Sequence, residues 1–211
     1  MAQWYDGFES GNVELNTCWV QQAGGFHVYR AASARAGGRY INWLRGDNVA
    51  STLGAKRISH LLPPAADLSK SVLWAFMFAK DDDGANDVTR FWLFANEPGV
   101  QYNSVSIRGY YVNISTTNIN LLEDNVGALT TVLNNAWVSD TNEHLVVITR
   151  EISGVQRLWR LYLDPPWDNL TDPGSLLGGP TNDATHGPAQ GLYYGVNQDD
   201  GDRVGEILLQ S

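Results

Sequence analysis

The stretch that decides the fold is residues 145–164, LVVITREISGVQRLWRLYLD. It begins with a short run of apolar and β-branched residues, and a glycine then marks a turn. Apolar and polar side chains alternate in its second half, where one face carries Trp159, Leu161 and Leu163 and the other carries Arg160, Tyr162 and Asp164. Alternation with a period of two is typical of a β-strand that buries one face. The stretch therefore predicts a β-hairpin with a strongly apolar face.

An isolated β-hairpin is barely stable in water, so this apolar face needs a second sheet to cover it. The chain has 211 residues, a length that all-β sandwiches commonly use as one domain. Its 8 Trp, 9 Tyr and 6 Phe are a large aromatic load, most of which must lie in the core. We therefore expect a single domain over residues 1–211, with an all-β fold of two antiparallel sheets packed as a β-sandwich.

The remaining pattern predicts about a dozen strands and no convincing helix. Gly24 and Gly25 are expected to form a hairpin turn between two of these strands. The Pro-, Gly- and Asp-rich residues 165–188 are expected to form a long loop. Outside residues 145–164, the predicted strands cover residues 4–8, 18–21, 26–30, 40–44, 56–62, 71–79, 90–95, 105–108, 110–115, 119–122, 130–133, 137–138, 191–197 and 204–210.

Charge and cysteine content narrow the classes of partner. The formal net charge is −9, from 14 basic and 23 acidic residues, which argues against nucleic acid and anionic membranes as partners. The lone Cys18 excludes an internal disulfide.

No apolar run approaches the ~20 residues of a membrane helix, so membrane insertion is not expected. The first residues show no signal peptide, because Trp4 already belongs to a predicted strand, and we expect either a processed signal or a virion component.

The order of the motifs resembles that of a known group of domains. These motifs are YDGFESG at residues 5–11, the apolar strands at 72–78 and 90–94, HLVVITR at 144–150, WRLYLD at 159–164, GLYYGV at 191–196 and GEILLQ at 205–210. Together they resemble concanavalin A-like and laminin-G-like jelly-roll domains, particularly bacterial and phage versions. The resemblance implies two antiparallel sheets, one flat or convex and one concave, with ligands usually held on the concave face or at the loop rim.

Some enzymes share this fold, but their sequence signatures are absent. Retaining glucanases of this shape carry an E-x-D-x-E strand, which places the acid and the nucleophile on one face. No two glutamates of this chain lie four residues apart, and no R-x-E-x-R strand typical of alginate lyases occurs. We therefore expect no catalytic residues, and a polysaccharide lyase or glycoside hydrolase with an atypical site is the least favoured function.

Glycan recognition requires aromatic faces beside planar polar side chains. Each candidate taken alone is more readily explained by core or rim packing, so the prediction rests on the set. The predicted ligand-binding residues are Arg160, Tyr162, Asp164, Tyr111, Asn113, Trp137 and Trp167.

These residues suggest a non-catalytic glycan-binding or adhesion module displayed on an outer surface, with a polysaccharide or a cell-surface glycan as its partner. The alternative is a structural or decoration protein of a phage virion or other surface assembly, which binds virion or surface proteins. A homo-oligomer is compatible with both functions.

The acidic segment at residues 81–87 is a candidate metal site. Asp81, Asp83 and Asp87 are oxygen donors of the kind that a structural calcium ion prefers. Asp199, Asp200 and Asp202 form a second candidate group. The alternative that we favour for the acidic segment is a solvated hairpin tip, because Asp, Asn and Gly are also good turn formers. The four histidines lack the spacing of a zinc site.

We predict that calcium and a chelator give the same melting temperature within about 1 °C, as expected if residues 81–87 form a plain turn. A calcium site at a hundredfold excess over its dissociation constant would instead add about 2.7 kcal/mol of stability. A shift above about 4 °C that disappears in Asp83→Ala would establish the calcium site.

Overall fold

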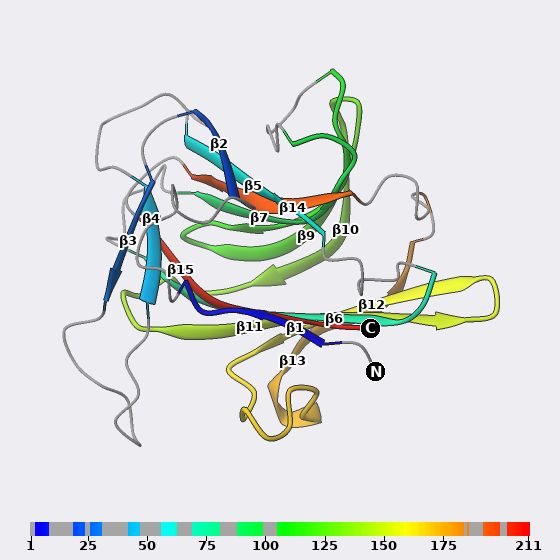
Figure 1. Cartoon of the computed structure of the whole chain (residues 1–211). Helices are drawn as coiled ribbons and strands as arrows, with labels where there is room; N and C mark the ends of the chain where they lie inside the picture. The colour runs from blue at the N-terminus through cyan, green and yellow to red at the C-terminus, as the bar shows by residue number, and fades with distance from the viewer. Residues whose placement is uncertain are drawn as a thin grey trace.

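The computed structural model describes residues 3–8, 19–23, 26–30, 42–46, 56–62, 69–80, 88–98, 105–183, 185, 192–198 and 202–211. These residues form two antiparallel β-sheets that pack face to face (Figure 1). The all-β sandwich predicted from the alternating hairpin is therefore confirmed. Among the described residues, no helix is long and apolar enough to cross a membrane.

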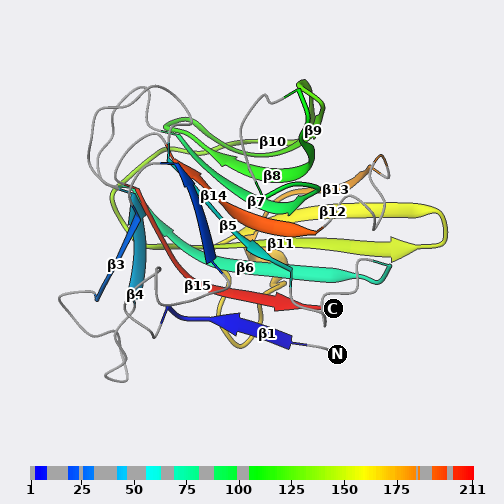
Figure 2. The ribbon, with the colours of Figure 1, turned by 45° about the horizontal axis from the view of Figure 1, so that its top comes forward.

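Sheet A has eight strands, in the order β13-β12-β11-β6-β15-β4-β3, with β1 paired to β15 (Figure 2). The predicted hairpin is β11–β12, and β11 also pairs with β6 in the middle of the sheet. The bounds are β1 Gln3–Asp6, β3 Phe26–Arg30, β4 Asn42–Gly46, β6 Val72–Ala79, β11 His144–Ser153, β12 Gln156–Leu163, β13 Leu176–Asn182 and β15 Arg203–Gln210.

Sheet B has seven strands, in the order β10-β9-β8-β7-β14-β5-β2. Its strands β7 to β10 form a meander, whereas most other connections cross between the sheets. The bounds are β2 Trp19–Ala23, β5 Lys56–Leu61, β7 Thr89–Ala95, β8 Arg108–Ile114, β9 Asn118–Asn125, β10 Ala128–Ala136 and β14 Tyr193–Gln198.

The crossing connections correct two turn predictions. β2 pairs with β5 in sheet B while β3 pairs with β4 in sheet A, so Gly24 and Gly25 do not join a hairpin. The strands β6 and β7, which flank residues 81–87, lie in different sheets and so do not pair as a hairpin, while residues 81–87 themselves lie outside the described residues. Both predictions relied on turn composition, which indicates a change of chain direction but not the sheet that the chain enters.

The strand β13 was also missed, because its LLGGPTN sequence lies inside the predicted loop at residues 165–188. Proline and glycine are tolerated there since β13 is an edge strand of sheet A. Residues 137–138, predicted as a strand, lie beyond the end of β10.

The main core lies between the sheets and contains the face of β12 that the sequence predicted to be buried. Trp159 is fully buried, with its ring 4.7 Å from the Tyr110 ring and 6.3 Å from the Phe94 ring of sheet B. Its indole N–H donates to the Asp183 carbonyl oxygen at 3.2 Å. Hydrophobic burial and cross-sheet aromatic contacts therefore both hold this strand in place.

Sheet A also buries apolar side chains on its outer face, away from sheet B. Val146 and Ile148 belong to the main core, whereas Val147 belongs to a separate outer cluster. The apolar run of β11 is therefore covered on both sides, which explains why it does not alternate. The outer cluster consists of Trp43, Ala75, Met77, Ala79, Leu145, Val147, Tyr162 and Leu208.

We expect Trp159→Ala to lower the free energy of unfolding by about 3–5 kcal/mol, because it removes a large buried aromatic side chain. Trp167→Ala is the matched control, since Trp167 is 45% exposed, and it should cost less than about 0.5 kcal/mol. Equilibrium denaturation measures both values. A loss below about 1 kcal/mol for Trp159→Ala would contradict the assigned faces of β12.

Candidate functional site

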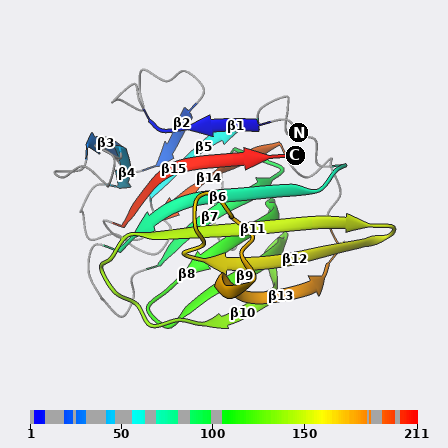
Figure 3. The same cartoon turned by 90° about the horizontal axis from the view of Figure 1, so that it is seen from below.

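Between β12 and β13 the chain crosses the outer face of sheet A as a strap, residues 165–175 (Figure 3). Its backbone is ordered by turns: the Asn169 N–H donates to the Pro166 carbonyl oxygen at 2.9 Å, and the Asp172 N–H to the Asn169 carbonyl oxygen at 3.1 Å. Leu170 of the strap packs against the outer cluster. The strap therefore covers part of the apolar surface that faces away from sheet B.

A cavity of about 670 Å³ lies between the strap and the outer face of sheet A. This strap pocket falls within the usual range of small-molecule sites, about 300–1,000 Å³. Arg160 and Tyr162, both named from the sequence, line it together. Other lining residues are Leu73 of β6, Thr149 and Glu151 of β11, Thr171 of the strap and Gln210 of β15.

The strand register explains why polar side chains meet in the strap pocket. Arg160 pairs with Thr149, Thr149 with Leu73, and Leu73 with Gln210. Residues directly opposite one another in neighbouring strands project from the same face, so these four form one row across β12, β11, β6 and β15. We refer to this row as the pocket rung. It brings together residues from strands that are far apart in the sequence.

Two hydroxyls of the strap pocket have no hydrogen-bond partner among the described residues. Tyr162 is only 6% exposed, yet its hydroxyl makes no hydrogen bond to any residue that the structure describes. The Thr149 hydroxyl is buried and also lacks a partner within the described segments. A buried hydroxyl without a partner, such as that of Thr149, costs about 1–3 kcal/mol, and such groups are uncommon in folded proteins. The pocket therefore presents hydrogen-bonding groups that the fold itself does not use.

The charged groups of the strap pocket form an ion pair. Arg160 Nη1 lies 2.7 Å from Glu151 Oε2, with side chains that are 26% and 51% exposed. Within the described part of the chain, this is the one hydrogen bond of either side chain. Glu151 therefore keeps a second oxygen as an acceptor, and Arg160 keeps further N–H donors.

Asp164 lies at the start of the strap but binds His144. The Nδ1 atom of His144 is 2.8 Å from Asp164 Oδ2, and its Nε2 atom is 2.9 Å from Asp140 Oδ1. The other oxygen of Asp164 accepts the Leu145 N–H at 2.8 Å. The hydrogen bond to Asp164, assisted by Asp140, raises the pKa of His144 to about 9. Both carboxylate oxygens of Asp164 are engaged, so we no longer include Asp164 among the candidate ligand-binding residues. We refer to His144 with Asp140 and Asp164 as the histidine clamp.

The two predicted tryptophans have different environments. Trp137 is partly buried against the main core, with its ring 5.6 Å from that of His144 and 6.3 Å from that of Phe78. We therefore assign Trp137 a packing role in place of the predicted ligand contact. Trp167 projects from the strap and is 45% exposed, so an aromatic face remains accessible beside sheet A.

Tyr111 and Asn113 lie on the outer face of sheet B, on the opposite side of the sandwich from the strap pocket. Tyr111 and its neighbour Trp92 are fully buried, with ring centroids 4.6 Å apart. Asn113 belongs to a polar row across six strands, formed by Arg57, Asn197, Arg90, Asn113, Asn120 and Asn134. Within this row Arg90 Nη1 donates to the side-chain Oδ1 of Asn197 at 3.2 Å. The predicted ligand set is thus divided between two faces.

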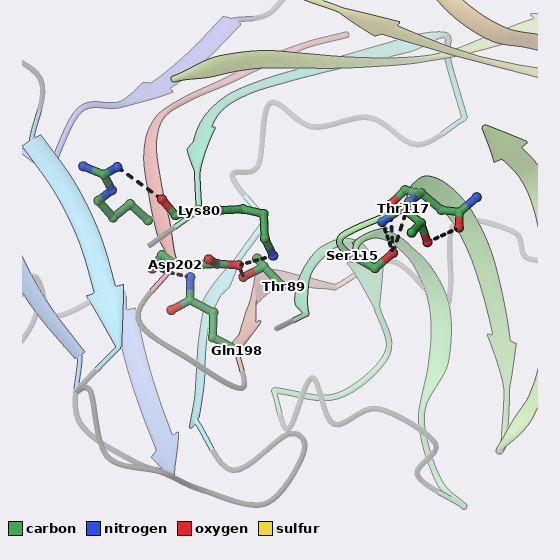
Figure 4. A network of polar contacts seen from close by, with 8 residues as sticks. Lys80, Thr89, Ser115, Thr117, Gln198 and Asp202 are labelled. Atoms are coloured by element: carbon green, nitrogen blue, oxygen red, sulfur yellow. Dashed lines mark hydrogen bonds and ion pairs between the residues drawn. The ribbon is translucent and has the colours of Figure 1, made fainter. Parts of the chain in front are cut away.

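The candidate calcium ligands Asp81, Asp83 and Asp87 lie outside the described residues. Of the second group, Asp202 is described, and it serves as the counter-ion of Lys80 at 3.8 Å, with both side chains fully buried (Figure 4). The Thr89 hydroxyl donates to the same carboxylate at 2.8 Å. No cluster of three or more metal-ligating side chains occurs in the described segments.

Sequence reasoning did not identify Thr149, Glu151 or Gln210 as site residues. Strand alternation places Thr149 and Glu151 on one face of β11, and Gln210 ends an otherwise apolar strand. The sequence pattern thus shows that these side chains are polar, but only the register of β11, β6 and β15 shows that they lie next to one another. Register between strands so distant in sequence is not contained in local pattern.

No protein-family model and no curated protein matches this sequence. Solved structures show similarity in fold. Domain 4 of AbnA, an extracellular arabinanase of Geobacillus stearothermophilus solved with arabinotriose, is 9% identical, with 97% of this chain and 89% of that chain covered and a TM-score of 0.56. Peanut lectin is 11% identical, with 100% and 97% covered and a TM-score of 0.54.

The carbohydrate recognition domain of Emp46p is 9% identical in its potassium-bound form, with 93% of this chain and 89% of that chain covered and a TM-score of 0.54. The same domain has also been solved free of metal. These neighbours are a domain solved with arabinotriose, a lectin and a carbohydrate recognition domain, and they agree with the concanavalin A-like fold expected from the sequence. At such low identity the similarity establishes the fold alone.

Because of the histidine clamp, we expect the free energy of unfolding to fall at alkaline pH. The pKa of His144 is raised from 6.5 to about 9 in the folded protein, so its stabilisation is complete below pH 6.5 and disappears as the pH rises through about 9. We expect a loss of about 1–2 kcal/mol between pH 6.5 and 9.5, which is less than the shift alone implies because both carboxylates are partly exposed. Denaturant titrations at each pH measure the change.

His144→Gln is the control for this titration. The variant lacks the titrating imidazole, so its free energy of unfolding should change less than that of the wild type over the same pH interval. Equal pH dependence of the two proteins would exclude the histidine clamp as the cause.

Proposed function

We propose that this protein is a non-catalytic glycan-binding module and that the strap pocket is its binding site. The fold supports the proposal, since AbnA domain 4 was solved with arabinotriose and peanut lectin and Emp46p share the architecture. Display on an outer surface, as expected from the sequence, is the setting that we propose for such a module.

The observation that carries the proposal is that Thr149 and Tyr162 line the 670 Å³ pocket while their hydroxyls make no hydrogen bond to any residue that the structure describes. A ligand rich in hydroxyl groups would satisfy them, because each hydroxyl both donates and accepts. The Arg160 guanidinium, the Glu151 carboxylate and the Gln210 amide add planar polar groups of the kind that orient sugars.

The composition of the strap pocket also supports binding without hydrolysis. Glycoside hydrolases generally use two carboxylic acids that flank the scissile bond. Glu151 is the one Asp or Glu side chain that lines the described pocket, and it is already paired with Arg160. A polysaccharide would therefore be held here but not cleaved by that mechanism.

We predict that the double variant Thr149→Val/Tyr162→Phe loses glycan binding while retaining its stability. Each lost hydrogen bond should weaken binding about tenfold, whereas removing unpaired hydroxyls should leave the free energy of unfolding unchanged or slightly higher. A glycan array followed by calorimetry on the strongest hit measures binding, and denaturant titration measures stability.

Asn113→Ala/Asn134→Ala is the matched control on the outer face of sheet B, and it should bind like the wild type. The proposed site would be wrong if this control lost binding while the pocket variant kept it. Absence of wild-type binding to every polysaccharide on the array would contradict the glycan-binding function itself. Release of shortened or unsaturated products from a bound polysaccharide would show catalysis.

A further inference from the structure

The chemistry of the strap pocket also indicates which sugars it would select. Of its lining residues, Arg160 and Glu151 are the oppositely charged pair, and their side chains meet at 2.7 Å. Arg150 contributes to the wall, but its guanidinium lies over the Trp159 ring, 5.6 Å from the ring centroid, on the core side. Lys70 is exposed at the rim and already has an interaction partner. Inside the pocket the charges of Arg160 and Glu151 therefore offset each other, while Lys70 adds a positive charge at the exposed rim.

The ion pair presents a donor and an acceptor side by side. Glu151 has one carboxylate oxygen that no described residue contacts, and Arg160 has N–H groups beyond the one that binds Glu151. Two adjacent hydroxyls of a neutral sugar match this arrangement, because one donates to the carboxylate while the other accepts from the guanidinium. A sugar carboxylate would match Arg160 alone and would be repelled by Glu151.

The pocket rung also sets a minimum length for the ligand. Arg160 and Gln210 lie at its two ends, with β11 and β6 between their strands. Neighbouring strands are about 4.8 Å apart, so the two ends are separated by roughly 14 Å. The Gln210 amide has no hydrogen-bond partner in the described part of the chain. One sugar ring is too short to reach both ends.

On the premise that the strap pocket binds glycans, we propose that its ligand is a neutral oligosaccharide that lies along the pocket rung. Two adjacent hydroxyls of one residue bind the Arg160–Glu151 pair. Further residues reach Thr149, Tyr162 and Gln210. The pair then selects against uronic acids, since an anionic sugar competes with Glu151 for Arg160.

The experiment compares neutral and uronic-acid trisaccharides of matched linkage by calorimetry with the whole chain. Wild-type protein should bind the neutral member at least about tenfold more tightly, with affinity that changes less than about twofold between low and high salt. Glu151→Gln should weaken neutral binding about tenfold and strengthen binding of the acidic member. Gln210→Ala should weaken binding of the neutral trisaccharide.

Glu97→Gln is the matched control. Glu97 follows β7 of sheet B, accepts a hydrogen bond from Ser106 and lies outside the strap pocket. The variant should leave both affinities unchanged. Tighter and salt-sensitive binding of the acidic trisaccharide would overturn the proposed ligand class while leaving glycan binding intact. No effect of Gln210→Ala would overturn the placement along the rung, and absence of binding to all sugars would instead contradict the function on which the proposal rests.

Discussion

The structure depends on one constraint: the central strands of sheet A bury apolar side chains on both faces. Val146 and Ile148 face sheet B, while Val147 and Leu145 face the other way. A sandwich of two sheets covers only the first of these faces. The strap, with Leu170 packed on the outer cluster, supplies cover for the second. The strap is therefore part of the fold and not a loose excursion between β12 and β13.

The strap pocket lies where the outer face of sheet A changes from apolar to polar. Along β11 the outward side chains run from Leu145 and Val147 to Thr149 and Glu151, and β15 changes from Leu208 to Gln210. The strap packs on the apolar positions because their burial is favourable, whereas burial of the polar positions would gain little. The change from apolar to polar side chains along these strands therefore determines both where the strap packs and where the strap pocket stays open.

The sequence was sufficient to predict which face of the hairpin is buried, but not which residues come together in the strap pocket. Alternation placed Trp159 in the core and Arg160 and Tyr162 on the opposite face, because the period of two follows directly from strand geometry. Gln210 could not be added, since its place on the pocket rung depends on the pairing of β15 with β6, which is distant in sequence. The strand β13 was missed because its glycines and proline are unfavourable except at a sheet edge.

Both outer faces of the sandwich carry a row of polar side chains, and hydrogen bonds engage three amides of the row on sheet B. On sheet B, Asn197 accepts a hydrogen bond from Arg90, Asn120 accepts the Asn135 N–H at 3.1 Å, and Asn134 accepts from Asn118 at 3.4 Å. These three hydrogen bonds tie strands of sheet B together and so stabilise the sheet. On sheet A, Thr149 and Tyr162 receive no such bond from the described residues, although both sit on well-packed strands. Polar groups that a fold holds rigidly but does not satisfy are available to a ligand.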